Sequence, residues 1–218
     1  MKLRRTLSLR VAATTLACLS VPVLAQPPGG NQPPQDTSMS FFVTSVGKGD
    51  GANLGGIEGA DAHCQALAEA AGSTGKTWHA YLSTSTEDAR DRIGAGPWFN
   101  ANGQLVARSV DHLHYSNVLL NKTNSITEKK GTVNGVGDQP NQHDILTGSN
   151  PDGTKNENTC NNWTSNGEGA AVVGHLDRVG GGAMAESWNA AHNSRGCSQE
   201  QLQASGGNGY FYCFATGE

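Results

Sequence analysis

The sequence lacks a long hydrophobic run. Its one mainly apolar segment, residues 11–24, is shorter than the roughly 20 residues that a transmembrane helix needs. Thr14, Thr15, Ser20 and Pro22 also interrupt this segment. We therefore expect no stable membrane span.

The sequence is also poor in basic residues. Of its 15 Lys and Arg, four lie in residues 1–25, whereas all 19 Asp and Glu lie beyond them. The rest of the chain thus carries 11 basic against 19 acidic groups, a net charge of −8 with histidine neutral. Nucleic acid and heparin are polyanions, so neither is an expected partner.

Three common catalytic and phosphate-binding motifs are absent. There is no GxSxG segment, no HExxH segment and no GxxxxGK[ST] spacing. Ser, His and Asp are plentiful, but no spacing selects a triad, and triads are defined by geometry rather than by order in the chain. We expect a binding domain rather than an enzyme, with a hydrolase as the less favoured alternative.

The amino-terminal segment has the organisation of an export signal. A basic start, Met1–Arg5, precedes the apolar segment, and the small residue Ala25 ends it, which predicts cleavage before Gln26. We predict a signal peptide over residues 1–25 and a periplasmic or secreted (extracellular) location. Lipid attachment at Cys18 and twin-arginine export are alternatives with weaker motifs.

The remaining chain divides into a linker and one domain. Residues 26–39 contain four prolines and almost no apolar side chain, which is typical of an extended linker. Residues 40–216 have the length of a single domain.

Local patterns predict an α+β domain whose helices come early and whose sheet comes late. Strands are expected at residues 41–44, 78–82, 170–173 and 210–215 and helices at 59–72 and 85–93. Residues 117–147 are expected to form a long surface loop interrupted by short strands. Ser85 and Asp88 fit a capping box for the second helix. Asn102-Gly103 predicts a hairpin turn.

Four cysteines lie beyond the predicted signal peptide: Cys64, Cys160, Cys197 and Cys213. An even set in an exported chain predicts a disulfide framework, because oxidising compartments preserve such bonds. Four cysteines allow three pairings, and their positions alone leave all three open.

Several blocks resemble a known fold. Residues 59–65, 70–72, 80–83, 148–153, 160–164, 196–197 and 212–213 resemble endostatin-like domains and bacterial secreted lectin-like domains, which share the C-type-lectin-like fold. The resemblance implies two early helices, a mixed or antiparallel sheet, long loops and two nested disulfides, Cys64–Cys213 outside and Cys160–Cys197 inside. The histidine zinc site near the amino terminus of endostatin-like domains is not carried over, because no histidine precedes His63.

Amides and acids gather around residues 138–158, where a sugar- or calcium-binding loop is one hypothesis and a solvated, turn-rich loop is the other. The residues expected to contact a ligand are Asn141, Asp144, Asn150, Asp152, Asn156, Glu157, Trp188 and Asn189. Calcium is a candidate cofactor at Asp152, Glu157 and Asn189, although Ala190 replaces the aspartate of the lectin motif.

His112 and His114 are a weaker metal candidate. If they alternate along a strand, both face the same way, with Asp111 nearby. Two histidines are too few ligands by themselves, so a surface strand is the favoured interpretation.

The expected function is a secreted lectin-like binding module. Its long-loop face would recognise carbohydrate or another cell-surface ligand, with a glycan or a cell-surface protein as partner. The alternative is a structural or protein–protein interaction domain of the cell envelope without a small ligand.

Overall fold

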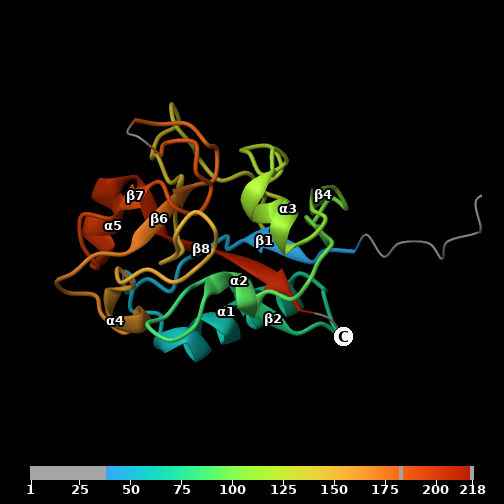
Figure 1. Cartoon of the computed structure of the whole chain (residues 1–218), viewed down its shortest axis with the longest axis horizontal. Helices are drawn as coiled ribbons and strands as arrows, with labels where there is room; N and C mark the ends of the chain where they lie inside the picture. The colour runs from blue at the N-terminus through green and yellow to red at the C-terminus, as the bar shows by residue number, and fades with distance from the viewer. Residues whose placement is uncertain (1–37, 182–183, 217–218) are drawn as a thin grey trace, which may run out of the picture. The chain divides into compact units, whose positions relative to one another are not determined.

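The last strand, β8 (Gly207–Ala215), is the centre of the fold. The structure is a computed structural model that describes residues 38–181 and 184–216. The predicted signal peptide, residues 1–25, and most of the predicted linker, residues 26–39, lie outside the described residues. Phe211, Tyr212, Cys213 and Phe214 of β8 are fully buried, so the strand is covered on both faces (Figure 1).

Six strands form the main sheet, and β8 pairs with three of them. It runs antiparallel to β1 (Phe41–Val43) and β2 (Trp78–Ala80) and parallel to β5 (Asp144–Leu146). The sheet then continues through β6 (Val172–His175) to β7 (His192–Asn193), both antiparallel to their neighbours. The functional residues described below lie on this second half of the sheet.

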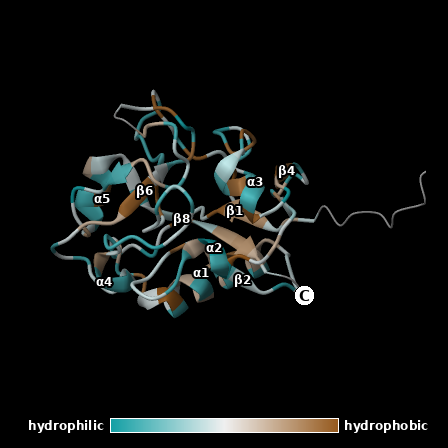
Figure 2. Ribbon diagram, in the orientation of Figure 1, coloured by the Kyte–Doolittle hydropathy of each residue, from teal (hydrophilic) through white to brown (hydrophobic). Residues whose placement is uncertain are grey.

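The sheet separates two hydrophobic cores, as the alternation of side chains along a strand requires. One core contains Leu146, Val173, Phe211 and Cys213 with helix α1 (Gly56–Ala70) and helix α5 (Gln199–Ser205). The other contains Phe41, Ile145, Tyr212 and Phe214 with helix α3 (Val110–Tyr115). Figure 2 shows hydrophobic residues along β1, β6 and β8 and polar ones in the surrounding loops.

Helix α1 is fastened to the sheet by a disulfide bond. Gly56, Ala60, Cys64 and Ala68 are its buried residues, spaced by four, and Cys64 is bonded to Cys213 of β8. The second bridge joins Cys160 to Cys197. These are the two pairings that the resemblance implies.

The second predicted helix is much shorter than expected. The prediction covered residues 85–93, whereas α2 spans only Ala89–Arg92. The predicted capping box is wrong: Asp88 is the N-cap without a side-chain cap bond, because its carboxylate accepts the Lys155 backbone N–H instead (2.9 Å). The predicted hairpin is present, as β3 (Trp98–Phe99) and β4 (Leu105–Ala107).

The expected early strands are present as β1 and β2, and the predicted long loop ends in the short strand β5. The expectation that the helices all come early is wrong, because helix α5 comes late. His112 and His114 lie in α3 rather than on a strand. A late helix was not predicted, although Ser198 and Gln201 form a complete capping box at its start.

An unusual turn begins at Cys160, the first cysteine of the second disulfide bond. The element α4 (Cys160–Trp163) contains four consecutive residues with φ between 47° and 65°, which is the left-handed region. Each such residue costs roughly 1 kcal/mol or more. The turn is held by the Cys160 bridge, by the Trp163 Nε1–H bond to Ser83 O (2.8 Å) and by bonds between Asn162 and Ser85.

The α+β class with two disulfides is therefore confirmed, while the specific C-type-lectin-like fold stays a prediction. Within residues 38–181 and 184–216, no helix combines the length and the apolar character needed to cross a bilayer.

Candidate metal centre

Strand pairing brings an acid and two histidines onto one face of the sheet. Asp144 on β5 lies directly opposite His175 on β6, so their side chains project to the same side. His192 on β7 pairs with Val173, two residues before His175, which places it diagonally across from His175. His143 immediately precedes β5, and its ring stacks on that of His175, with centroids 4.2 Å apart.

The three histidines point their Nε2 atoms at one carboxylate oxygen, Asp144 Oδ1. The distances to this atom are 3.3 Å from His143, 3.4 Å from His175 and 3.5 Å from His192. The ligand atoms of His143, Asp144 and His175 all lie within 4.8 Å of one another. The side chains of these three residues are 6%, 1% and 2% exposed, whereas that of His192 is 38% exposed.

The opposite nitrogen of each buried ring is tied to an acceptor. His143 Nδ1–H donates to Asp177 Oδ1 (2.9 Å), and His175 Nδ1–H donates to the Ala185 carbonyl (2.8 Å). A carboxylate and a carbonyl only accept, so Nδ1 must carry the proton in both rings. The Nε2 lone pairs of the neutral rings are then directed at Asp144. This is the arrangement in which metal-binding histidines are usually oriented by a second residue.

Several polar atoms in this cluster have no hydrogen-bond partner among the described residues although they are buried. They are Asp144 Oδ1 and Oδ2, His175 Nε2 and, beside them, Asn141 Oδ1. A buried carboxylate without a partner is strongly unfavourable. Most such groups in native proteins are satisfied by protein, water or an ion, so the cluster is chemically unusual.

Burial and hydrogen bonding shift the pKa values of His175, Asp177 and His192 around the cluster. Burial lowers the pKa of His175, and the neighbouring His143 lowers it further. Burial alone would raise the pKa of Asp177, but the hydrogen bonds from His143 and the Val136 N–H outweigh it, and the pKa lies below its usual value. The Asp144 carboxylate raises the pKa of the more exposed His192.

The donor set suits a transition metal. Zinc bonds to histidine nitrogen and carboxylate oxygen are about 2.0–2.2 Å long, which places neighbouring ligand atoms of a tetrahedron about 3.3 Å apart. The distances from Asp144 Oδ1 to the Nε2 atoms of His143 and His175 are close to this value. Calcium prefers six to eight oxygen ligands and is a poor match for two imidazoles and one carboxylate.

A glycine forms one wall of the cluster. Gly180 has φ +151°, and a Cβ on it would lie 2.8 Å from His175 Cε1 and 3.7 Å from His143 Cε1. Gly181 follows it, and a Cβ there would meet no atom within 4 Å. The backbone at Gly180 therefore packs directly against the two stacked rings.

If the cluster holds zinc, the Gly180→Ala variant should bind it roughly 10- to 100-fold more weakly than the wild type, which is the range for changes to groups that orient metal ligands. The new methyl group would displace the His175 ring or break its bond to Ala185. Isothermal titration measures the change, and Gly181→Ala is the matched control that should retain the wild-type affinity. Equal affinities in all three proteins would contradict this arrangement of Gly180 and the rings.

Two of the residues predicted from the sequence, Asp144 and Asn141, lie in or beside this cluster. Four others lie together in the neighbouring loop and mostly contact one another or the loop backbone: Asn150, Asp152, Asn156 and Glu157. Asn150 Oδ1 accepts from Asn156, Asp152 Oδ1 accepts from Thr154, and Glu157 is exposed.

The last two predicted residues are inside the protein. Trp188 is 3% exposed and packs against Tyr81, His114 and Tyr212. Asn189 is 1% exposed, and its amide nitrogen donates to Tyr81 Oη and to the carbonyls of Asn150 and Pro151. This amide connects the loop to the core. Calcium at Asp152, Glu157 and Asn189, and glycan binding by this loop, stay predictions.

The second histidine pair from the sequence does not form a common site. His114 Nε2 bonds to Tyr81 Oη (2.7 Å), and burial lowers the pKa of His114. His112 instead contacts the backbone and side chain of Arg108. The two rings are thus used separately by α3 and its surroundings.

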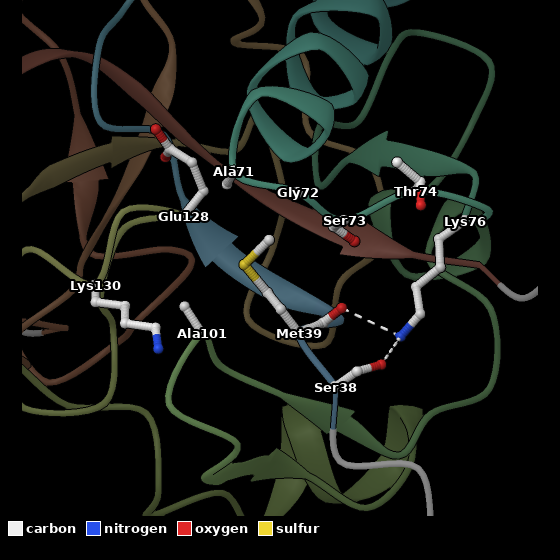
Figure 3. Close-up of a pocket in the computed structure, with 10 residues that line it drawn as sticks. All are labelled: Ser38, Met39, Ala71, Gly72, Ser73, Thr74, Lys76, Ala101, Glu128 and Lys130. Carbon is white, nitrogen blue, oxygen red and sulfur yellow. Dashed lines mark hydrogen bonds between the residues drawn. The ribbon is translucent and has the colours of Figure 1, made fainter.

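A pocket of about 260 Å³ lies near the start of the described chain, beside the end of α1 (Figure 3). The Met39 side chain lies in it, and Lys76 Nζ donates to Ser38 Oγ (2.5 Å) and to the Met39 carbonyl (3.2 Å). The Glu128 carboxylate at its edge accepts two bonds from Ser45. These contacts hold the first residues of the domain against its body.

Sequence reasoning found Asp144 but missed His143, His175, His192 and Asp177. The signals present in the chain were the adjacent pair His143-Asp144 and the pair His175 and Asp177, two residues apart. Neither pair has a recognised metal-binding spacing. The ligands come together only because β5, β6 and β7 are neighbours in the sheet.

No curated protein matches the chain at the level required for a significant similarity. A protein family does match, over residues 48–179, which is more than half of the chain. The matched segment includes His143, Asp144, His175 and Asp177, while His192 lies beyond it. The chain belongs to the family described as Protein of unknown function (DUF1554).

Proposed function

We propose that this domain binds a divalent transition-metal ion, zinc above all, through His143 Nε2, Asp144 Oδ1 and His175 Nε2. The observation that carries the proposal is the set of buried atoms without partners at the meeting point of these side chains. An ion would satisfy them together, because it accepts the two nitrogen lone pairs and balances the buried carboxylate charge.

A proton could satisfy the cluster in place of an ion, but the surroundings of the two rings disfavour it. A protonated His175 would pair with Asp144, yet burial and His143 both oppose its protonation. A neutral ring could donate to Asp144 only if its proton were on Nε2. The Nδ1–H bonds of His143 to Asp177 and of His175 to the Ala185 carbonyl keep the proton of each ring on Nδ1 instead. The hydrogen bonds behind the rings thus favour a metal over a proton on His143 or His175. A proton on His192, whose pKa is raised by Asp144, is the competing arrangement that zinc binding would have to displace.

We expect the purified, metal-free protein to bind one zinc ion per chain and to unfold at a higher temperature with zinc than with a chelator. A ligand at 100 times its Kd stabilises the native state by about 2.7 kcal/mol, provided that the unfolded chain does not bind it. Isothermal titration and thermal unfolding measure both effects.

Histidine variants provide the controls for this experiment. His175→Ala should abolish zinc binding and the thermal shift, because it removes a buried ligand. His112→Ala is the matched control, since His112 lies in α3 outside the cluster, and it should behave like the wild type. No bound zinc in the wild type, or equal losses in the two variants, would refute the proposed function.

A further inference from the structure

We infer that the metal centre has one coordination position for an exogenous ligand, on the side of His192, and that this position accepts water or a small anion. The inference rests on the proposed function, because it requires the ion to be present. It adds that the centre is an open one, which can exchange a ligand with the solvent, rather than a closed structural site.

The four side chains of the cluster differ in their exposure to solvent. His143, Asp144 and His175 are almost completely buried, so the protein covers the site from their side. His192 is the one substantially exposed member of the four, at 38%, and lies on a strand of two residues at the edge of the sheet. Solvent therefore reaches the cluster where His192 lies.

The Nδ1 atoms of the three histidine rings have different kinds of partner. His143 and His175 are oriented by Asp177 and by the Ala185 carbonyl, which come from other parts of the chain. The Nδ1 of His192 instead contacts the carbonyl of the next residue, Asn193 (2.9 Å). The ring of a metal-binding histidine is normally held by a carboxylate or carbonyl that accepts a hydrogen bond from its other nitrogen. His192 is less firmly held, as expected for a group beside a bound water rather than a fixed ligand.

The distances between the ligand atoms also favour three protein ligands with one open position. The compact set with all ligand atoms within 4.8 Å of one another contains His143, Asp144 and His175 but not His192. Three protein ligands with a fourth position for water are typical of catalytic zinc sites, whereas structural sites have four protein ligands. His192 Nε2 is 3.5 Å from Asp144 Oδ1, within reach of a ligand that the ion would hold.

The side-chain amide of Asn141 lies close to Gly206, near the cluster. Its Oδ1 is buried and has no hydrogen-bond partner among the described residues. Gly206 lies between it and the cluster: a Cβ at this glycine would be 3.1 Å from Asn141 Nδ2 and 3.5 Å from His143 Nε2. A side chain at Gly206 would contact both residues, so the glycine keeps the space between them free. Asn141 Nδ2 is the amide atom nearest to Gly206, so its N–H groups would donate to a metal-bound water or anion.

Charge selects the class of exogenous ligand. The two carboxylates near the ion, Asp144 and Asp177, together balance a divalent charge. The open position therefore favours a neutral or singly charged donor, such as water, hydroxide or azide, over a multiply charged anion.

The test replaces zinc by Co²⁺, whose visible absorption reports its coordination, and uses azide as the exogenous ligand. We expect the Co²⁺-loaded full chain to show absorption bands that shift on azide addition and saturate. His192→Ala should still bind Co²⁺, with a loss of affinity of about tenfold, the lower end of the range for residues that surround a metal without binding it. Asn141→Ala should retain the Co²⁺ affinity but change the azide affinity.

The outcomes separate this inference from the proposed function. Loss of Co²⁺ binding in His192→Ala, or a bound-cobalt spectrum that azide does not change, would identify a closed site with His192 as the fourth ligand. Either result would overturn the inference and leave metal binding intact. Failure of the wild type to bind both Co²⁺ and zinc would instead refute the proposed function, and the inference with it.

Discussion

Replacing Asp144 by Asn should stabilise the metal-free protein and destabilise the zinc-loaded protein. Without an ion, the Asp144 carboxylate is buried, and neither of its oxygens has a hydrogen-bond partner among the described residues. The amide of Asn is neutral, and its N–H group would donate to an Nε2 lone pair of His143 or His175, now 3.3 and 3.4 Å from Oδ1. Relief of an unsatisfied buried group corresponds to about 1–3 kcal/mol in the free energy of unfolding.

With zinc the sign reverses, because the amide oxygen is a weaker, uncharged ligand. At a zinc concentration 1,000 times the wild-type Kd, binding stabilises the wild type by about 4.1 kcal/mol, and most of this is lost in Asp144→Asn. Urea unfolding with chelator and with zinc measures both values. A variant that is less stable than the wild type under both conditions would show that Asp144 has a structural role unrelated to metal.

The measurement is made at several pH values. The Asp144 carboxylate raises the pKa of His192 in the folded state. A raised pKa means that the charged pair of His192 and Asp144 stabilises the fold fully below the unfolded pKa of about 6.5 and is lost as the pH rises through the folded value. The difference between the two proteins should therefore stop changing once the pH exceeds the folded value, and this plateau reports the effect of the carboxylate itself.

Local signals in the sequence were sufficient for much of the fold. Apolar residues at helical spacing identified α1, and Asn102-Gly103 identified the hairpin of β3 and β4, where Gly103 has φ +71°. Predictions failed where a long-range contact overrides the local pattern. Asp88 caps no helix by its side chain because its carboxylate bonds to Lys155, 67 residues away. No property of residues 85–93 reveals that partner.

The metal centre illustrates the same limit. Asp144 was selected as an acid in a polar loop, but its partners His175 and His192 are 31 and 48 positions further along the chain. They meet because β6 pairs with both β5 and β7, and strand pairing is not encoded in any one segment. Trp188 and Asn189 were selected because both have the chemistry of ligand contacts, and the structure places both in the interior, where they pack against and connect the core.

Removal of the Cys64–Cys213 bridge should cause one of the largest losses of stability in this protein. The bridge joins residues 149 positions apart, and the chain-entropy model gives about 5 kcal/mol for a loop of this length. Both cysteines are fully buried between α1 and β8, so truncation to Ala also removes packing contacts. Urea unfolding of the Cys64→Ala/Cys213→Ala double variant measures the loss.

The Cys160–Cys197 bridge is the internal comparison for this experiment. It closes a shorter loop, with a separation of 37 residues, for which the same model gives about 4 kcal/mol. Cutting it would also release the left-handed turn of Cys160–Trp163, whose conformation is itself unfavourable. The loss in Cys160→Ala/Cys197→Ala should therefore be clearly smaller than in the first variant. The opposite order would mean that the left-handed turn depends on its surroundings for more stability than the long bridge provides.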